Sequence, residues 1–578
     1  MQTEERVQQA IPVETGAEEL LATLWEQGVR YIFANLGTDY PALVEAFAKA
    51  RALGAARPTV IICQHEIMAL SAAQGYAQVT RQPQAVFVHV DVGTANLGGT
   101  VHNAARGRVP VFIFAGQSPW TTRGEVLGSR TNPVQFIQDA PDQAAIVRQY
   151  VKWAYEVKSP LTIRQVVQRA LQVAKAEPAG PVYLMAAREP LAAHVTRNGT
   201  PARPADTVPA PTVPADPALE QAADWLVAAE RPLVVTGYLG RDPAAVPELV
   251  ALAERLALPV VEPSAYHLNF PRTHPLHLGA RVAPYLPQAD VVFVIDHDVP
   301  WLPAVVNPAP QAKVIHLDID PVKPGMQLVD IPADLRLQGT SALALRRLRE
   351  LLEARLDAAA AARLASRRAW VAEQRERARA AQAAALAPKD GQITAPLLAA
   401  TLGRLLPPSA LVLDESVSNA PWTLQLTART EPGTYFGSGG SSLGWGLGAA
   451  VGAKLAAPDR DVVLCVGDGA FVFGEPAAAF WAARRYSVPF LAVIYNNVGW
   501  GAVKNAALDQ YPEGFAQRAN DFTASFAPSS DLAMIAAAAG AYAERVSAPE
   551  ELEAALERGL AETRRGRAAA IEVAIVPI

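Results

Sequence analysis

The sequence is poor in cysteine and lacks any long uninterrupted apolar run. Its 578 residues include two cysteines, Cys63 and Cys465, and both stand within apolar segments. We therefore expect buried, reduced side chains in a protein of a reducing compartment, and we predict a cytoplasmic location. A membrane span needs roughly 18 consecutive apolar residues, and no stretch approaches that length. The charged start MQTEERVQQA has no apolar signal core, so no membrane association is expected.

An excess of positive charge is also missing. The chain has 51 basic and 56 acidic residues, for a formal net charge of −5. This balance gives no reason to expect a nucleic-acid partner. Hydrophobic residues make up 51% of the chain and charged residues 19%, which is typical of a globular protein.

Apolar, strand-like runs alternate with helical patterns along most of the chain. Such alternation is typical of parallel sheets that are covered by helices on both faces. The predicted fold class is therefore α/β, with three doubly wound parallel-sheet domains. The expected limits are 1–190 for the first domain, 191–217 for a proline-containing linker, 218–345 for the central domain, 346–390 for a helical connector and 391–578 for the third domain. The connector's arginines are expected on a solvated helix face.

Polar residues stand at the ends of two predicted strands in the third domain. The apolar run 462–466 ends at Gly467-Asp468-Gly469, and the run 489–495 ends at Asn496-Asn497. Parallel strands present their carboxyl ends at the same sheet edge, where ligands bind. Asp468 and Asn497 carry oxygen ligands that suit Mg²⁺, and the glycines let the backbone approach a phosphate closely.

This pattern, GDG followed after 26 residues (470–495) by NN, resembles the metal–diphosphate motif of thiamine-diphosphate-dependent enzymes. The resemblance implies thiamine diphosphate and Mg²⁺ as cofactors. It also implies that Asp468, Asn497 and the Gly499 carbonyl bind the metal, and that the amides of Ala470 and Phe471 reach the diphosphate.

Two further segments resemble the diphosphate domain of this family. Glu415-Ser416-Val417-Ser418 is similar to the ESTS turn of benzoylformate decarboxylases, which implies that Ser418 and the Val417 backbone contact the diphosphate. Ser418 is also a candidate N-cap for a following helix. In GGSSLGWG, Leu443 corresponds to the bulky residue that holds the cofactor bent, and the Ser441 carbonyl corresponds to a pyrimidine contact.

The N-terminal part resembles the family's pyrimidine-binding domain. The resemblance is carried by His65-Glu66, by Gly75-Tyr76-Ala77 and by a loop expected at 93–96. It implies that Glu66 hydrogen-bonds N1′ of the aminopyrimidine. A carboxyl group in an apolar site has a raised pKa, so it can exchange a proton with that ring. Taken without this context, Glu66 is a favourable acid in a first helical turn.

The resemblance also implies how chains assemble. In the family the cofactor lies between the pyrimidine domain of one subunit and the diphosphate domain of another. Glu66 and Asp468 are then expected from different chains of a homodimer, and a homotetramer is the expected larger assembly.

The substrate residues are less clearly marked. Thr38 stands where benzoylformate decarboxylases have a serine, and His89 stands at their first histidine, where it is a candidate proton shuttle; the alternative is a structural histidine. Pro303 takes the place of their second histidine, with His297 nearby but out of register. The run 296–301 lacks the arginine-containing pattern of FAD-binding relatives, so FAD is not expected.

The predicted function is decarboxylation and/or carboligation of a small-molecule 2-oxo acid through a C2 ylid and an enamine, similar to benzoylformate decarboxylase. One alternative is an acetolactate-synthase-like carboligase without FAD, and a second is a 2-hydroxyacyl-CoA lyase. From a different class, a cofactor-binding regulatory paralogue without turnover is a further alternative.

Overall fold

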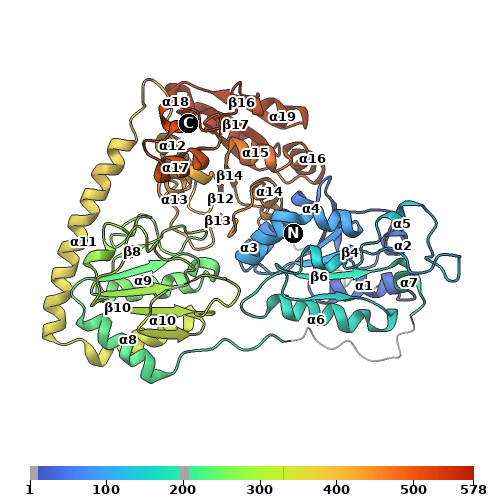
Figure 1. Cartoon of the computed structure of the whole chain (residues 1–578), viewed down its shortest axis with the longest axis horizontal. Helices are drawn as coiled ribbons and strands as arrows, with labels where there is room; N and C mark the ends of the chain where they lie inside the picture. Colours follow the sequence, from blue (N-terminus) through green and yellow to red (C-terminus); the bar gives the residue numbers. More distant parts are fainter. Residues whose placement is uncertain (1–10, 196–206, 330, 578) are drawn as a thin grey trace, which may run out of the picture.

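A computed structural model describes residues 11–195, 207–329 and 331–577 (Figure 1). Three sheets are built, and every strand pairing in them is parallel. The three units form a triangle in Figure 1, with the first unit in blue, the second in green and the third in orange and red. This confirms the predicted α/β class with three parallel-sheet units.

The N-terminal sheet has the strand order β2-β1-β3-β4-β6-β5. Its strands are β1 (Tyr31–Asn35), β2 (Thr59–Ile62), β3 (Ala85–Val88), β4 (Phe112–Gly116), β5 (Ala154–Glu156) and β6 (Val182–Ala186). The helices around it are α1 (Gly16–Glu26), α2 (Pro41–Ala52), α3 (Glu66–Thr80), α4 (Val90–Arg106), α5 (Val134–Ile137), α6 (Ile163–Lys175) and α7 (Arg188–Ala192).

The central sheet has the order β11-β10-β9-β7-β8. Its strands are β7 (Pro232–Thr236), β8 (Val260–Val261), β9 (Val291–Ile295), β10 (Lys313–Asp318) and β11 (Leu335–Gln338). Its helices are α8 (Asp216–Ala228), α9 (Ala245–Leu256) and α10 (Ser341–Leu351), followed by the long α11 (Ala358–Ala385). The predicted linker lies partly outside the described residues, which stop at 195 and resume at 207.

The C-terminal sheet has the order β13-β12-β14-β15-β17-β16. Its strands are β12 (Leu411–Glu415), β13 (Tyr435–Gly437), β14 (Val462–Gly467), β15 (Leu491–Asn496), β16 (Tyr542–Val546) and β17 (Ala569–Ala574). Its helices are α12 (Ala395–Leu405), α13 (Ala420–Leu426), α14 (Trp445–Ala456), α15 (Asp468–Phe473), α16 (Pro476–Tyr486), α17 (Gly501–Gln510), α18 (Phe515–Ala519), α19 (Leu532–Ala538) and α20 (Leu552–Arg564). The central strands β12, β14 and β15 are almost wholly buried, as the apolar runs predict.

Helix α11 runs along one side of the molecule from the central unit to the C-terminal unit (Figure 1). Arg368, Arg377 and Arg379 of this helix are exposed, but the Arg367 side chain is buried. Its guanidinium donates to the carbonyls of Leu226, Ala229 and Leu256. The expectation of a solvated helix face was therefore wrong at Arg367, because the ends of α8 and α9 offer carbonyls without intrahelical partners.

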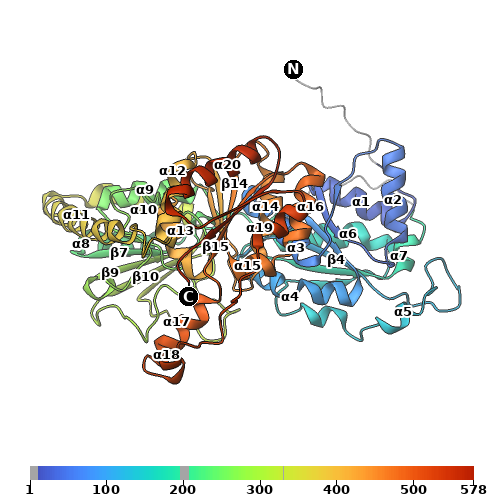
Figure 2. The ribbon, with the colours of Figure 1, turned by 90° about the horizontal axis from the view of Figure 1, so that it is seen from above.

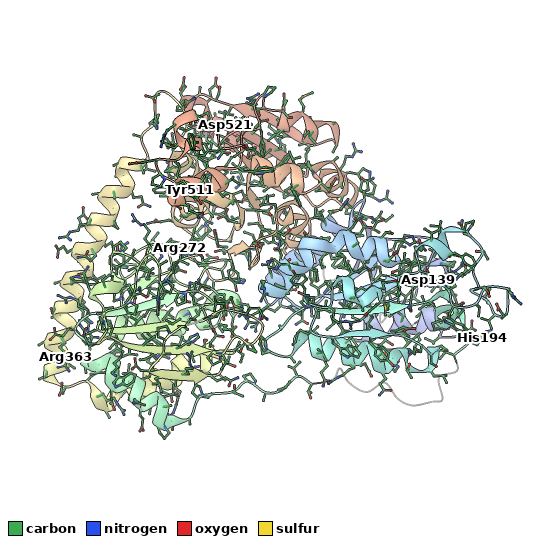
Figure 3. The ribbon with its side chains drawn as sticks, viewed as in Figure 1. Asp139, His194, Arg272, Arg363, Tyr511 and Asp521 are labelled. Atoms are coloured by element: carbon green, nitrogen blue, oxygen red, sulfur yellow. The ribbon has the colours of Figure 1, made fainter. Side chains whose placement is uncertain are left out.

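The central and C-terminal units also meet at Arg272, which Figure 3 labels between them. The buried Arg272 side chain pairs with Glu262, and its backbone amide donates to the Arg429 carbonyl (3.0 Å). The guanidinium also lies over the Tyr435 ring. A buried charge is stable only when it is paired with an opposite charge. The Glu262 carboxylate, within the central unit, is that opposite charge.

Helices α3 and α14 pack against one another along most of their length and lie side by side in Figures 1 and 2. Small residues allow this approach. A Cβ at Gly452 would overlap the Ala72 carbonyl, and one at Gly75 would overlap the backbone of Ala449. Because both helices begin at this contact, it brings Glu66, at the start of α3, to the loop that precedes α14.

Within the described residues, none of the helices combines the length and the apolar character required for a membrane span.

Candidate active site

The carboxyl ends of β12, β14 and β15 lie together at one edge of the C-terminal sheet. Glu415 pairs with Val466, and Gly467 pairs with Tyr495. The segments that follow these strands, 416–418, 468–471 and 497–499, are therefore neighbours. The sequence predicted this arrangement because a strand of such a sheet is typically about five residues long, and the chain turns where the apolar run ends.

Asp468 begins α15 and lies mostly buried, with 5% of its surface exposed. Its Oδ1 accepts the amide of Gly469 (2.8 Å), and its Oδ2 accepts the amide of Gly499 (2.9 Å). Burial raises the pKa of Asp468, and these backbone amides oppose that shift. The carboxylate thus joins the turn after β14 to the turn after β15. Ala470 and Phe471 lie in the same first turn of α15.

The two asparagines after β15 differ in their surroundings. Asn496 donates to Glu572 Oε1 (2.7 Å) and to Ser529 Oγ (3.1 Å), and its own Oδ1 accepts the Val498 amide. Asn497 is also buried, but no hydrogen bond from a described residue holds its side-chain amide. Asn496 therefore fixes the turn, while the amide of Asn497 is available to a ligand.

Backbone strain marks both turns. Val417 has φ +51° and Val498 has φ +59°. A β-branched residue seldom adopts the left-handed region, and each such residue costs about 1–3 kcal/mol. Strain of this kind collects at ligand sites, where the surrounding structure enforces it. The two valines mark the predicted diphosphate turn and the predicted metal turn.

Ser418 does not have the predicted N-cap role. Residues Val417–Asn419 form a short 3₁₀ turn, η6, and α13 starts after Asn419 without a side-chain cap. Ser418 cannot cap α13 because it lies inside this turn and Asn419 stands directly before the helix. The hydroxyl and amide of Ser416 bond to Asp414 Oδ1 (2.6 and 2.8 Å). Ser418 is half-buried at the sheet edge, so its predicted contact with a diphosphate is not affected.

Glu66 starts α3, where His65 caps the helix by accepting the Ile67 amide at Nδ1 (3.1 Å). The Glu66 carboxylate is buried and accepts a hydrogen bond from Asn96 Nδ2 (3.1 Å). Residues 93–96, expected as a loop, lie instead within α4, which is kinked at Gly98. The helical turn is what aims Asn96 back at Glu66.

The loop before α14 lies against the N-terminal unit. The amide of Asn103 donates to the Ser442 carbonyl (2.8 Å), and Ser441 Oγ contacts His102 Nε2 (3.2 Å). Leu443 is partly buried and packs against the core shared by the two units. It is followed by Gly444 (φ +93°), which turns the chain into α14.

Glu415 is a buried acid at this site that sequence reasoning did not assign beyond its place in the turn. Its carboxylate accepts the amides of Trp445 (3.0 Å) and Gly446 (2.8 Å), the first residues of α14. Burial raises the pKa of Glu415 to about 7, against the opposing effect of these amides. Glu415 therefore ties the diphosphate turn to the loop that carries Leu443.

Two cavities open at this junction. The larger, of about 1070 Å³, lies between the central and C-terminal units and contains Val417, Ser441 and Leu443 in its wall. The smaller, of about 560 Å³, contains Asp468, Gly469 and Trp500, together with Ile67 from the start of α3. Five of the predicted cofactor residues thus line these two cavities: Val417, Ser441 and Leu443 the larger, and Asp468 and Gly469 the smaller.

Thr38 and His89 lie at the carboxyl edge of the N-terminal sheet. Thr38 is exposed in the turn after β1. His89 follows β3, and its Nδ1 lies 2.5 Å from Oδ1 of Asp39, a buried residue. Sequence reasoning missed Asp39, although its position beside Thr38 was a usable signal. The hydrogen bond with Asp39 is the main cause that raises the pKa of His89.

The residues present fit a metal–diphosphate group. Mg²⁺ commonly takes one or two protein carboxylates and completes its shell with phosphate and water. Asp468 supplies one carboxylate, and the unpartnered amide of Asn497 and the carbonyl of Gly499 follow β15. Among the described residues there is no cluster of three or more His, Cys, Asp or Glu side chains suited to a metal. Such a site needs a ligand that brings its own negative charge, as a diphosphate does.

Comparison with known proteins agrees with this chemistry. Family models of the thiamine pyrophosphate (thiamine diphosphate) enzymes match in three parts: the N-terminal TPP binding domain at residues 14–146, the central domain at 219–348 and the C-terminal TPP binding domain at 416–573. Mg²⁺ is the standard partner ion of the cofactor in this family.

Individual relatives cover most of the chain. It is 28% identical over 516 residues to a benzoylformate decarboxylase of Pseudomonas aeruginosa, covering 87% of this chain and 90% of that protein. It is 26% identical over 588 residues to the acetolactate synthase isozyme 3 large subunit of Escherichia coli, covering 97% and 95%. The crystal structure of a benzoylformate decarboxylase from Polynucleobacter necessarius shares the fold, with a TM-score of 0.79, 22% identity and coverage of 98% and 100%. The chain therefore belongs to the thiamine-diphosphate-dependent enzyme family and is an enzyme that uses this cofactor.

Proposed function

We propose that this enzyme decarboxylates a 2-oxo acid and/or joins the resulting fragment to a second carbonyl compound, with thiamine diphosphate and Mg²⁺ as cofactors. The observation that carries the proposal is the α3–α14 contact. It brings the start of α3, which carries Glu66, against the C-terminal unit, where Ile67 shares a cavity with Asp468. The bound cofactor supplies a nucleophilic carbon that adds to the 2-oxo group.

The chain's own residues then hold and orient the reacting groups. Asp468, Asn497 and the Gly499 carbonyl hold Mg²⁺, and the Val417 backbone, Ser418, Gly467 and the amides of Gly469, Ala470 and Phe471 surround the diphosphate. Glu66 holds a proton at the aminopyrimidine, in a buried position that keeps water away from the carboxyl group. Leu443 and the Ser441 carbonyl would contact the bound cofactor on the side of its rings.

The walls of the larger cavity favour a substrate with an apolar side chain. Val299, Leu302 and Val305 of the central unit face it with 43%, 59% and 71% of their surfaces exposed. When an apolar ligand covers exposed apolar side chains in a cavity, the removal of their surface from water stabilises the complex. This supports decarboxylation of a bulky 2-oxo acid, as the name of the Pseudomonas relative suggests.

Product analysis tests the proposal. The purified chain, supplied with thiamine diphosphate and Mg²⁺, is incubated with benzoylformate in one reaction and with pyruvate in another. We expect CO₂ and free aldehyde, with a higher kcat/KM for benzoylformate. Acetolactate from pyruvate would favour the acetolactate synthase alternative, for which the Escherichia coli relative speaks. Absence of CO₂ from both acids would contradict the proposal and favour acyl-CoA substrates or a regulatory role.

We propose further that the working unit is a homodimer whose active sites lie between subunits, and that two dimers pair as a homotetramer. Here the α3–α14 contact is made within one chain. We propose that two copies exchange these units and form the same contact between chains. Leu127 and Ile137, exposed by 80% and 84%, offer apolar surface that a second copy would cover.

A mixing experiment tests this exchange. At a thiamine diphosphate concentration that just saturates the wild type, Glu66→Gln and Asp468→Asn are each expected to be nearly inactive alone. Refolded or expressed together, they form mixed dimers in which one of the two sites has both residues intact, so about a quarter of the wild-type activity returns for a two-fold dimer. No recovery, with mixed dimers shown by differential tags, would place Glu66 and Asp468 of each site in one chain.

A further inference from the structure

Asp39 and His89 form a pair one helical turn away from Glu66. Their strands, β1 and β3, are neighbours, with Asn35 opposite Val88, so the residues that follow each strand meet. Nδ1 of His89 lies 2.5 Å from Oδ1 of Asp39. The His89 carbonyl accepts the amide of Gly93 (2.6 Å), and a Cβ at Gly93 would lie 3.2 Å from Glu66 Oε1.

Two glycines pack closely against the pair. A Cβ at Gly37 would overlap the His89 ring, and a Cβ at Gly116 would overlap the Asp39 carboxylate. Beneath the pair, the Tyr40 hydroxyl bonds to the carbonyls of Val88 (2.7 Å) and Phe114 (3.1 Å). The floor of the pair is thus fixed by the backbone of β3 and β4.

The negative charge of Asp39 and the positive charge of protonated His89 stabilise each other. Asp39 is buried, with 3% of its surface exposed, and its Oδ2 has no hydrogen-bond partner. Among the ion pairs of the described residues, Asp39 takes part in one, with His89. An isolated buried carboxylate is costly, so the imidazolium form of His89 balances it. The His89 side chain itself is 22% exposed, which gives its ring access to solvent.

We propose that Asp39 is a positioning residue that holds His89 protonated at Nδ1 and leaves Nε2 to deliver a proton during turnover. The proposal rests on the proposed decarboxylation. When a 2-oxo acid becomes an aldehyde, the bond to the carboxylate carbon breaks, CO₂ leaves and a C–H bond forms in its place. The imidazolium gives up that proton, becomes neutral and regains a proton from water.

Each polar group that faces His89 raises the pKa of its imidazole, and burial opposes them. The Asp39 hydrogen bond raises the pKa of His89, burial lowers it, and the Asp39 charge, the Gln138 side chain and the Asp91 charge raise it further. A proton donor with a raised pKa stays charged to higher pH. Turnover that needs protonated His89 is therefore expected to fall on the alkaline side, as the pH rises through this pKa.

The test combines Asp39→Asn with an NMR titration of His89 in the cofactor-loaded enzyme. The His89 ring signal is assigned by its loss in His89→Ala. We expect Asp39→Asn to lower the pKa of His89 and to move the alkaline limb of the kcat–pH profile to lower pH. At pH values above the shifted limb, kcat should be lower than that of the wild type by about 10-fold or more. Asp91→Asn removes a nearby charge without the hydrogen bond, so it is the matched control and should leave the limb nearly in place.

Several outcomes would overturn the proposal. An unchanged pKa of His89 in Asp39→Asn would show that Asp39 does not control the protonation of His89. A shifted pKa of His89 with an unchanged alkaline limb of the kcat profile would show that protonated His89 is not needed for turnover. In the His89→Ala background, Asp39→Asn should cost no further activity, and an additive loss would assign Asp39 a merely structural role. If no 2-oxo acid is turned over, the proposed function fails, while the NMR titration still decides whether Asp39 sets the protonation of His89.

Discussion

Glu66→Gln is expected to lower kcat by about 100-fold or more, because an amide cannot exchange a proton with the aminopyrimidine and general acid–base catalysis contributes at least that much. Stability should change little. Glutamine has nearly the same shape, and its amide oxygen can still accept the hydrogen bond from Asn96 Nδ2. Steady-state turnover with a saturating 2-oxo acid and saturating thiamine diphosphate measures the effect, and calorimetry confirms that cofactor binding persists.

The matched control is Glu45→Gln, an exposed acid on α2 of the same unit. It is expected to leave turnover and cofactor binding unchanged. Cofactor-dependent turnover of Glu66→Gln at the wild-type rate would contradict the proposed role of Glu66. Loss of thiamine diphosphate binding would instead mean that Glu66 contributes to affinity rather than to proton exchange.

Asp468→Asn is expected to weaken the apparent affinity for Mg²⁺ and thiamine diphosphate by at least about 100-fold. Loss of a residue outside a metal's ligand shell costs 10- to 100-fold, and Asp468 is a proposed ligand. It also supplies the one carboxylate of the proposed metal site, so its replacement removes the protein's charge there. Titration of cofactor at fixed Mg²⁺, followed by the fluorescence of Trp500 in the same cavity, measures the change.

The control for this variant is Asp459→Asn, an exposed acid in the loop before β14. It should bind the cofactor as the wild type does. Because Asp468 also joins two turns through the amides of Gly469 and Gly499, the melting temperature without cofactor must be compared. If Asp468→Asn keeps wild-type affinity for Mg²⁺, the metal is held elsewhere and the proposed ligand set is wrong.

Local features of the site followed from the sequence. The end of β14 at Gly467 and the end of β15 at Asn496 match the expected ends of the apolar runs to within one residue. Helix α3 starts at Glu66, as expected, because His65 caps it. These features depend on neighbours within a few residues, where hydrophobic pattern and helix capping decide the structure.

The exceptions have identifiable causes. Residues 93–96 were expected as a loop from the resemblance to the family pattern, yet they are helical in α4, where Asn96 bonds to Glu66. Ser418 read as an N-cap by residue type, but Ser416 is engaged by Asp414 and α13 begins without a cap. In both places the residue type was compatible with more than one backbone conformation, so it did not decide the structure.

By itself, the sequence determined the three parallel-sheet units, the polar turns after β14 and β15 and the family to which the chain belongs. Only the tertiary structure decided which polar groups are engaged. Glu572, 76 residues from Asn496, leaves Asn497 as the available amide. Asp39 meets His89 across 50 residues, and Glu415 meets the start of α14 across 30. Strand order and helix packing set these pairings, and both depend on chain folding over distances that local patterns do not encode.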